Sequence, residues 1–316
     1  MRLRRLILPV AILMLAAGVG LARASAEEPA KIRFGTLPVL QALPVFVAQD
    51  GGLFAKSGVK ADVVMFNTAA EKDIALSTGN IDGYFGDLVT PIVLRGNGRG
   101  VSIVATNYDT GHDRRMFAIL AKPGSSCRKV MDLASLPIAI SSNTVIDYVT
   151  EKLLNVSGVP REKFTSMETK NIGLRMQMLL SGQVEAATLP EPLVTAAIAK
   201  GAVFLADDSG LSASQTVLVF SVPFLKGHAS DVKAFLKVLD EAANMINANP
   251  DSVRSVMVEH VRLPEALKAS YPVPRFPKLH APDREAVVSI AEWLKGRGVI
   301  KTAPPYEQVV DAEFIH

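Results

Sequence analysis

Residues 31–66 read KIRFGTLPVLQALPVFVAQDGGLFAKSGVKADVVMF, and this stretch decides the fold class. Apolar and polar residues alternate over 31–35, as expected of a β-strand. Pro44 stands where a helix begins, and Gly51-Gly52 ends that helix. A second strand-like run follows over residues 59–66. The stretch therefore predicts a β-α-β unit, in which a helix connects two parallel strands.

The same alternation continues along the chain. The other expected strands are 81–85, 101–106, 116–121, 137–141, 164–167, 184–189 and 216–222. The other expected helices are 69–77, a helix from Asp87 with Pro91 in its first turn, 143–156, 173–180, 192–200, 230–248, 251–260 and 282–296. This order predicts an α/β protein with two lobes, each a mostly parallel sheet flanked by helices. The lobes are expected to be joined by crossings near 116–123 and 216–223, with the C-terminal helices packing on the first lobe.

The N-terminus has the pattern of a secretory signal peptide. Three arginines lie within residues 1–5, residues 6–21 are almost wholly apolar, and Ala24-Ser25-Ala26 forms an Ala-x-Ala end. This pattern predicts cleavage after Ala26 and export to the periplasm. No later apolar run approaches the roughly 20 residues that a membrane-spanning helix needs.

Charge and cysteine content exclude several classes of protein. The chain has 34 basic and 31 acidic residues, and loss of the four arginines within residues 1–26 leaves 30 basic against 31 acidic. Because no Lys/Arg cluster remains, nucleic acid is not an expected partner. Cys127 is the only cysteine, which excludes an intramolecular disulfide. The histidines lack metal-ligand spacing, and we expect neither a metal nor a cofactor.

Several motifs resemble those of the nitrate-, sulfonate- and taurine-type periplasmic binding proteins of ABC importers, a superfamily that includes thiamine-precursor binders. They are the opening over 32–59, ALSTGNID at 75–82, GDLVTP at 86–91, ILAKPGS at 119–125, and LSGQVEAA at 180–187 followed by EP at 191–192. Each motif alone is weak. Their order and spacing together are strong. The resemblance covers nearly the whole chain after residue 26.

The resemblance implies a type II periplasmic binding protein fold. Residues 27–117 and 223–316 would form one lobe, and residues 118–222 the other. Such a protein is not an enzyme; it captures a small molecule in the cleft, closes by hinge motion and delivers the molecule to an inner-membrane ABC permease with its ATPase. A monomer is expected, because the clamp must open. The alternative is a periplasmic ligand sensor or a small-molecule enzyme, since the same fold hosts enzymes.

Candidate ligand-binding residues lie beyond the carboxyl ends of the predicted strands, where open α/β sheets bind ligands. In the first lobe they are Thr36, Leu37, Gln41, Asn67, Thr68, Gly86, Asp87, Tyr108 and His112. In the second lobe they are Ser142, Asn143, Thr144 and Glu191.

Ser142, Asn143 and Thr144 are the best candidates for binding an anion. They precede a predicted helix, whose free N–H groups and dipole favour negative charge. Asn143 or Thr144 equally fits the role of a helix cap. The branched residues Val145-Ile146 replace the Ser/Thr-rich run typical of sulfonate binders, which argues against a bare inorganic anion or a sulfonate.

Asp87 and Glu191, one in each lobe, could flank the cleft as a pair of carboxylates. Such a pair suits a ligand with an amine, a protonated ring nitrogen or N–H donors. Both residues also fit structural roles, Asp87 as an N-cap and Glu191 as first-turn charge. Tyr108 and His112 offer surfaces on which a heterocycle could stack. The expected ligand is a nitrogen-containing organic molecule, with sulfonate, nitrate, pyrimidine, amino acid and aromatic carboxylate left open.

Overall fold

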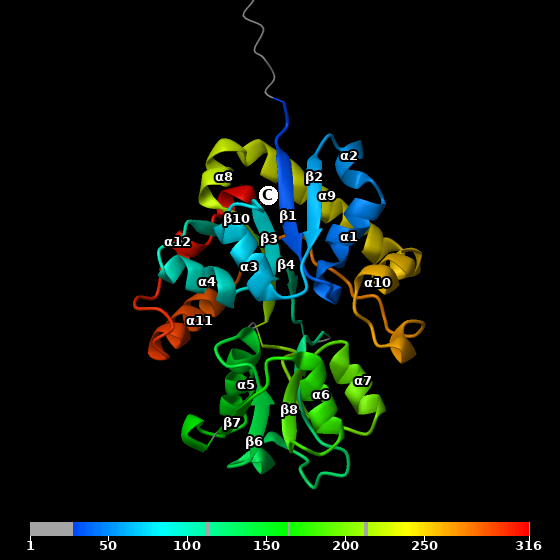
Figure 1. Cartoon of the computed structure of the whole chain (residues 1–316), viewed down its shortest axis with the longest axis vertical. Coiled ribbons are helices and arrows are strands. Elements are labelled where there is room, and N and C mark those ends of the chain that lie inside the picture. The colour runs from blue at the N-terminus through cyan, green and yellow to red at the C-terminus, as the bar shows by residue number, and fades with distance from the viewer. Residues whose placement is uncertain (1–27, 112–113, 164, 212–213, 316) are drawn as a thin grey trace, which may run out of the picture.

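The computed structural model describes residues 28–111, 114–163, 165–211 and 214–315. The predicted signal peptide, residues 1–26, lies outside them. The described chain forms two lobes, one above the other in Figure 1, and each lobe is built on its own five-stranded sheet. Within the described residues, no helix combines the length and the apolar character needed to cross a membrane.

The first sheet has the strand order β2-β1-β3-β10-β4. β1 pairs in parallel with β2 and β3, whereas β10 is antiparallel to both β3 and β4. Four of the five strands therefore point the same way. The strands are β1 (Lys31–Thr36), β2 (Lys60–Met65), β3 (Gly83–Asp87), β4 (Val101–Asp109) and β10 (Gln215–Ser221).

The second sheet repeats this plan with the order β7-β6-β8-β5-β9. β6 is parallel to β7 and β8, and β5 is the antiparallel strand, between β8 and β9. The mostly parallel sheets predicted for both lobes are thus confirmed. The strands are β5 (Phe117–Ala121), β6 (Pro137–Ile140), β7 (Thr165–Glu168), β8 (Ala186–Pro190) and β9 (Val203–Asp207).

Helices cover both faces of each sheet. In the first lobe, one face packs on α1 (Leu43–Asp50), α2 (Leu53–Lys56), α9 (Ala229–Ala248) and α10 (Arg254–His260), and a short helix α8 (Val222–Gly227) follows β10. The other face packs on α3 (Ala69–Ser77), α4 (Val89–Gly96), α11 (Arg284–Gly296) and α12 (Tyr306–Val309). In the second lobe, α5 (Val145–Val156) covers one face, and α6 (Ile172–Leu180) and α7 (Leu193–Ala199) cover the other.

The two-residue period of a strand explains why both faces are covered. In β5, Ala118 and Leu120 join the core under α6 and α7, whereas Ile119 and Ala121 join the core under α5. All four side chains are fully buried. A strand with apolar side chains on both faces cannot belong to a sheet that has one face exposed to solvent. Helices are therefore required on both sides.

The chain crosses between the lobes twice, through residues 110–116 and 208–214. Hydrogen bonds tie the two crossings together: Thr110 N–H donates to the Ser214 carbonyl (3.2 Å), and Gly210 N–H donates to the Gly111 carbonyl (3.2 Å). Asp208 is fully buried, and its Oδ1 accepts the N–H groups of the first crossing at 2.8 and 3.0 Å. The crossings therefore form one connected hinge segment.

The crossings expected near residues 116–123 and 216–223 lie slightly earlier in the chain, just before the strands that are also predicted there. Residues 116–123 contain β5 of the second sheet, and residues 216–223 contain β10 of the first sheet. The boundary predicted at residue 222 is therefore wrong by one strand, because β10 pairs with β3 and β4. β9, a short and mostly half-buried edge strand, had no predicted counterpart, since its residues do not alternate between polar and apolar.

Candidate functional site

A cavity of about 420 Å³ lies between the two lobes. Such a volume suits a small organic molecule, which would contact both lobes at once. From the first lobe it is lined by Leu40, Gln41, Tyr108, Tyr271, Pro272, Pro274 and Arg275. From the hinge segment and the second lobe it is lined by Arg114, Arg115, Glu191, Thr195, Asp207 and Ser209.

The first-lobe wall is held by a chain of hydrogen bonds. The Gln41 carbonyl accepts from Asn107 Nδ2 at 2.8 Å, and Asn107 Oδ1 accepts from Thr216 Oγ1 of β10 at 3.0 Å. Tyr108, near the end of β4, packs edge-on against Phe276 with ring centroids 5.5 Å apart. β4 and β10 thus hold Gln41, and Phe276 holds Tyr108, at this wall.

On the second-lobe side, Arg115 is surrounded by carboxylates. Its Nε donates to Glu191 Oε1 at 2.7 Å, and its Nη1 lies 3.8 Å from Asp207 Oδ2. Glu191 also accepts from the backbone N–H (3.2 Å) and Oγ1 (3.0 Å) of Thr195. The Glu191 side chain is only 7% exposed. Its charge is therefore compensated within the protein, and it offers no open carboxylate to an amine.

Tyr271 faces Glu191 from the opposite lobe. Burial raises the pKa of the Tyr271 hydroxyl far above its usual range, and the negative charge of Glu191 raises this pKa further. The hydroxyl consequently stays protonated at neutral pH, and the Glu191 carboxylate is its hydrogen-bond partner.

The cavity carries an excess of positive charge. Three guanidinium groups and two carboxylates line it. Arg115 is paired as described, and Arg114 Nη2 lies 2.9 Å from Asp109 Oδ1. Arg275 is exposed and makes no hydrogen bond or ion pair with any residue that the structure describes. Arg275 is thus the cavity's open cationic group.

Gln41, Tyr108 and Glu191 are the three predicted residues that the structure brings together around this cavity. His112 lies outside the described residues. The other nine predicted residues do not line it.

Four of these nine lie at the end of β1 or in the loops that follow β1 and β2. Thr36 is fully buried, and its Oγ1 has no hydrogen-bond partner within the described chain. The Leu37 carbonyl closes a turn by accepting from Val39 N–H (2.8 Å). Thr68 caps α3 by accepting from Glu71 N–H (3.2 Å). Asn67 Oδ1 accepts from the guanidinium of Arg262.

Asp87 takes the structural role. Its Oδ1 accepts the N–H groups of Val89 (2.8 Å) and Thr90 (3.2 Å), which caps α4. Burial raises the pKa of Asp87, against the opposing effects of these bonds and of the Lys72 ammonium. At Gly86, a Cβ would come within 2.9 Å of the Tyr84 ring, so packing alone accounts for this glycine. The predicted pair of cleft carboxylates is therefore not assembled.

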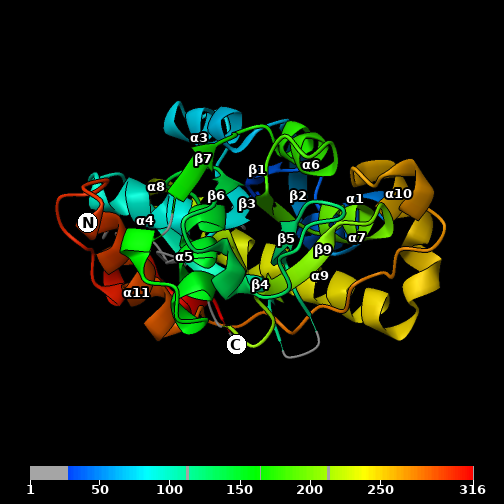
Figure 2. The same ribbon diagram turned by 90° about the horizontal axis from the view of Figure 1, so that it is seen from below.

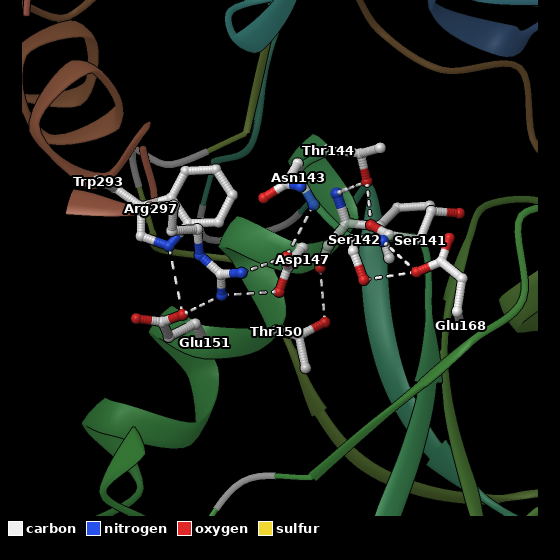
Figure 3. A network of polar contacts seen from close by, with 11 residues as sticks. Ser141, Ser142, Asn143, Thr144, Asp147, Thr150, Glu151, Glu168, Trp293 and Arg297 are labelled. Atoms are coloured by element: carbon white, nitrogen blue, oxygen red, sulfur yellow. Dashed lines mark hydrogen bonds and ion pairs between the residues drawn. The ribbon is translucent and has the colours of Figure 1, made fainter. Parts of the chain in front are cut away.

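The predicted anion site at the start of α5 is occupied by the protein's own carboxylates (Figure 3). Glu168 Oε2 accepts the Ser142 N–H at 2.9 Å, and Asp147 Oδ2 accepts the Asn143 N–H at 2.9 Å. Thr144 Oγ1 accepts from Ile146 N–H and is the N-cap of α5. In this conformation Asn143 and Thr144 serve the helix terminus, as the capping interpretation allowed, and Ser142 pairs with Glu168 of β7.

Four of the cavity residues that the sequence interpretation missed come from two places. Arg114 and Arg115 lie in the first crossing, next to a predicted strand, and were available as a pair of adjacent cations. Tyr271 and Arg275 lie in the proline-rich stretch between helices, where the prolines themselves are the signal for a fixed, non-helical wall. The first crossing follows β4, and this region supplied the candidates Tyr108 and His112, but its two arginines were not considered; the proline-rich stretch follows no strand, so the rule passed over it.

The sequence matches the family model described as NMT1-like over residues 25–261. It matches none of the curated proteins. Two solved structures with the same fold are the periplasmic aliphatic sulphonate-binding protein SsuA from Escherichia coli and the alkanesulfonate-binding protein SsuA from Xanthomonas axonopodis pv. citri, bound to MOPS. The first is 17% identical, with 90% of this chain and 92% of that chain covered and a TM-score of 0.78. The second is 19% identical, with 91% and 100% covered and a TM-score of 0.75.

The desulfurization enzyme DSZB also shares the fold, at 14% identity and a TM-score of 0.67, with 90% of this chain and 97% of that chain covered. These likenesses confirm the predicted two-lobed binding-protein fold. They also illustrate that one fold carries both binding and catalysis.

Proposed function

This chain belongs to the NMT1-like family, and from that premise we propose that it is an exported solute-binding protein of an ABC importer. It captures a small molecule between its lobes and presents the closed form to an inner-membrane permease. The protein acts as a monomer in the periplasm, and the signal peptide is cleaved after Ala26.

The cavity between the lobes is the observation that carries this proposal. Residues of both lobes and of the hinge segment line it. A ligand that bridges the lobes stabilises the closed arrangement by its additional contacts, which is the thermodynamic basis of a clamp. A pocket shared by both lobes and two hydrogen-bonded crossings support this proposal.

The ligand that fits the cavity is an organic anion with an apolar body. Arg275 provides an open guanidinium, and Leu40, Tyr108 and Pro272 provide apolar surface. Glu191 is compensated by Arg115, which removes the reason to favour an amine. The two SsuA proteins are named as binding proteins for an aliphatic sulphonate and an alkanesulfonate. Both of these ligands are organic anions.

A thermal-shift screen of the full-length chain tests the proposal. The panel comprises alkanesulfonates, aromatic carboxylates, nitrate, pyrimidines and amino acids. A ligand at about 1,000 times its Kd adds about 4 kcal/mol of stability, which moves the melting temperature by several degrees. We expect such a shift for an organic anion, with the compound recovered unchanged.

Two outcomes contradict the proposal in different ways. A flat panel removes the support for a solute-binding role in these ligand classes. Chemical conversion of a bound compound identifies an enzyme on this fold, as DSZB is.

A further inference from the structure

The lobes meet a second time, between α5 of the second lobe and α11 of the first. Figures 1 and 2 both place α5 and α11 on one flank of the molecule and α7, beside the cavity, on the other. α11 packs on α4 of its own lobe. None of the residues of this α5–α11 seam lines the cavity.

Arg297, which directly follows α11, reaches across to two carboxylates of α5 (Figure 3). Its Nη1 lies 3.0 Å from Asp147 Oδ2, and its Nη2 lies 2.7 Å from Glu151 Oε2. Asp147 is 1% exposed at its side chain, so this ion pair is shielded from water on one side. A planar guanidinium that bridges two carboxylates holds their relative position more strictly than a single surface pair does.

Aromatic and hydroxyl contacts extend the seam. Trp293 Nε1 donates to Glu151 Oε2 at 3.2 Å, and the Trp293 ring lies edge-on to Tyr148 with centroids 5.3 Å apart. Tyr148 Oη donates to Ser289 Oγ at 2.9 Å. One continuous cluster of apolar side chains includes residues of both helices. The seam thus has a packed interior as well as polar partners.

The seam is connected to the loop that precedes α5. Asp147 Oδ2, which pairs with Arg297, also accepts the Asn143 N–H at the start of α5. Asn143 has a left-handed backbone (φ 58°), which an unsupported asparagine adopts less readily than a glycine does. Arg297 therefore supports, through Asp147, the loop that precedes α5.

We propose that the α5–α11 seam is a latch that holds the two lobes together without ligand, and that Arg297 is its central positioning residue. The latch sets the fraction of molecules in the closed arrangement. If the proposed solute-binding function is right, the apparent Kd equals the intrinsic Kd divided by that fraction, so a broken latch weakens ligand binding without touching the ligand.

The test measures the distance between the lobes in the absence of ligand. Spin labels at Lys170→Cys in the second lobe and Lys237→Cys on α9 report it by double electron–electron resonance, in a Cys127→Ala background of the full-length chain. Both lysines are exposed. We expect one short distance in this parent and a second population at longer distance after Arg297→Ala.

Arg284→Ala is the matched control. Arg284 is the first residue of α11, pairs with Glu307 at 2.6 Å and stacks on Tyr306 at 4.1 Å, but all these residues belong to the first lobe. It should leave the distance distribution unchanged. Glu151→Gln, which removes one partner of Arg297 and keeps the packing, serves as a second variant if Arg297→Ala does not fold.

The proposal is overturned if Arg297→Ala, or Glu151→Gln in its place, gives the same distances as Arg284→Ala. It is also overturned if the parent without ligand shows only the long distance. Because the measurement uses no ligand, its failure is distinct from a failure of the proposed function, which the thermal-shift screen reports.

Discussion

The seam and the cavity both lie between the two lobes, and arginines and carboxylates occur in both. They differ in how many of these charged side chains have an ion-pair partner within the protein. In the seam, Arg297 has two carboxylate partners and an aromatic neighbour. In the cavity, Arg115 is equally well paired, but Arg275 has no partner among the described residues.

The difference separates structural charge from charge available for binding. A paired guanidinium stabilises the arrangement that it bridges and has little to gain from a ligand. An unpaired guanidinium at a cavity wall contributes little to folding and gains a partner only when an anion arrives. Arginine content alone therefore does not identify a binding site; the pairing state of each arginine does.

The largest expected effect is at the paired arginine of the cavity. Arg115→Met leaves Glu191 and Asp207 without their cation, and Glu191 is nearly buried. We expect the free energy of unfolding to fall by about 3–4 kcal/mol, the scale of a broken buried pair. Urea unfolding measures it. Adding Glu191→Gln to Arg115→Met should restore part of the lost stability. If Arg115→Met alone is as stable as the parent, the ion pairs of Arg115 do not stabilise the fold.

Asp208 in the hinge segment should make stability depend on pH. Burial raises the pKa of Asp208 from 3.8 to about 6. The folded state then binds a proton that the unfolded state releases, so stability falls as the pH rises from about 4 to 6. Above that range the ionised carboxylate costs about 2–3 kcal/mol.

Asp208→Asn tests this dependence, because the amide oxygen can still accept the N–H groups of Met116 and Phe117. Urea unfolding at pH 4, 5, 6 and 7 should show the variant gaining on the parent as the pH rises. Parallel pH profiles for the two proteins would show that Asp208 titrates normally.

Much of the fold was predictable, because strands and helices depend on local periodicity. The unit over residues 31–66 has the expected elements, β1, α1 and β2. β10 shows the limit of this reasoning. Its apolar run predicts a strand correctly, but which sheet it joins depends on pairing with β3 and β4, more than 100 residues earlier in the chain.

The cavity was less predictable, because its residues do not share one kind of position. Glu191 follows a strand and was found by looking beyond strand ends. Arg275 lies in a proline-rich loop that is far along the sequence from any strand end. Asp87 follows the same rule as Glu191 and caps a helix instead. Position at a strand end thus selects polar residues, but only the three-dimensional arrangement separates caps from cavity walls.

Arg275→Ala sharpens the contrast between paired and open arginines. We expect affinity for an organic anion to fall about 10- to 100-fold, the scale of a lost charged hydrogen bond. Stability should change by less than about 0.5 kcal/mol, as is usual for an exposed side chain. Lys278→Ala is the matched control, an exposed cation of the same loop outside the cavity. Calorimetry on both variants decides; equal affinities would remove Arg275 from the site.

The smallest effect is expected at Asp87, where a carboxylate satisfied by backbone N–H groups replaces the expected ligand contact. Asp87→Ala removes the cap of α4 and should lower the free energy of unfolding by about 1 kcal/mol, with no change in ligand affinity. Asp87→Asn, which keeps a capping oxygen, should lose less. If ligand affinity falls in both variants while stability is unchanged, Asp87 belongs to the binding site. A carboxylate that accepts backbone N–H groups could then still bind ligand.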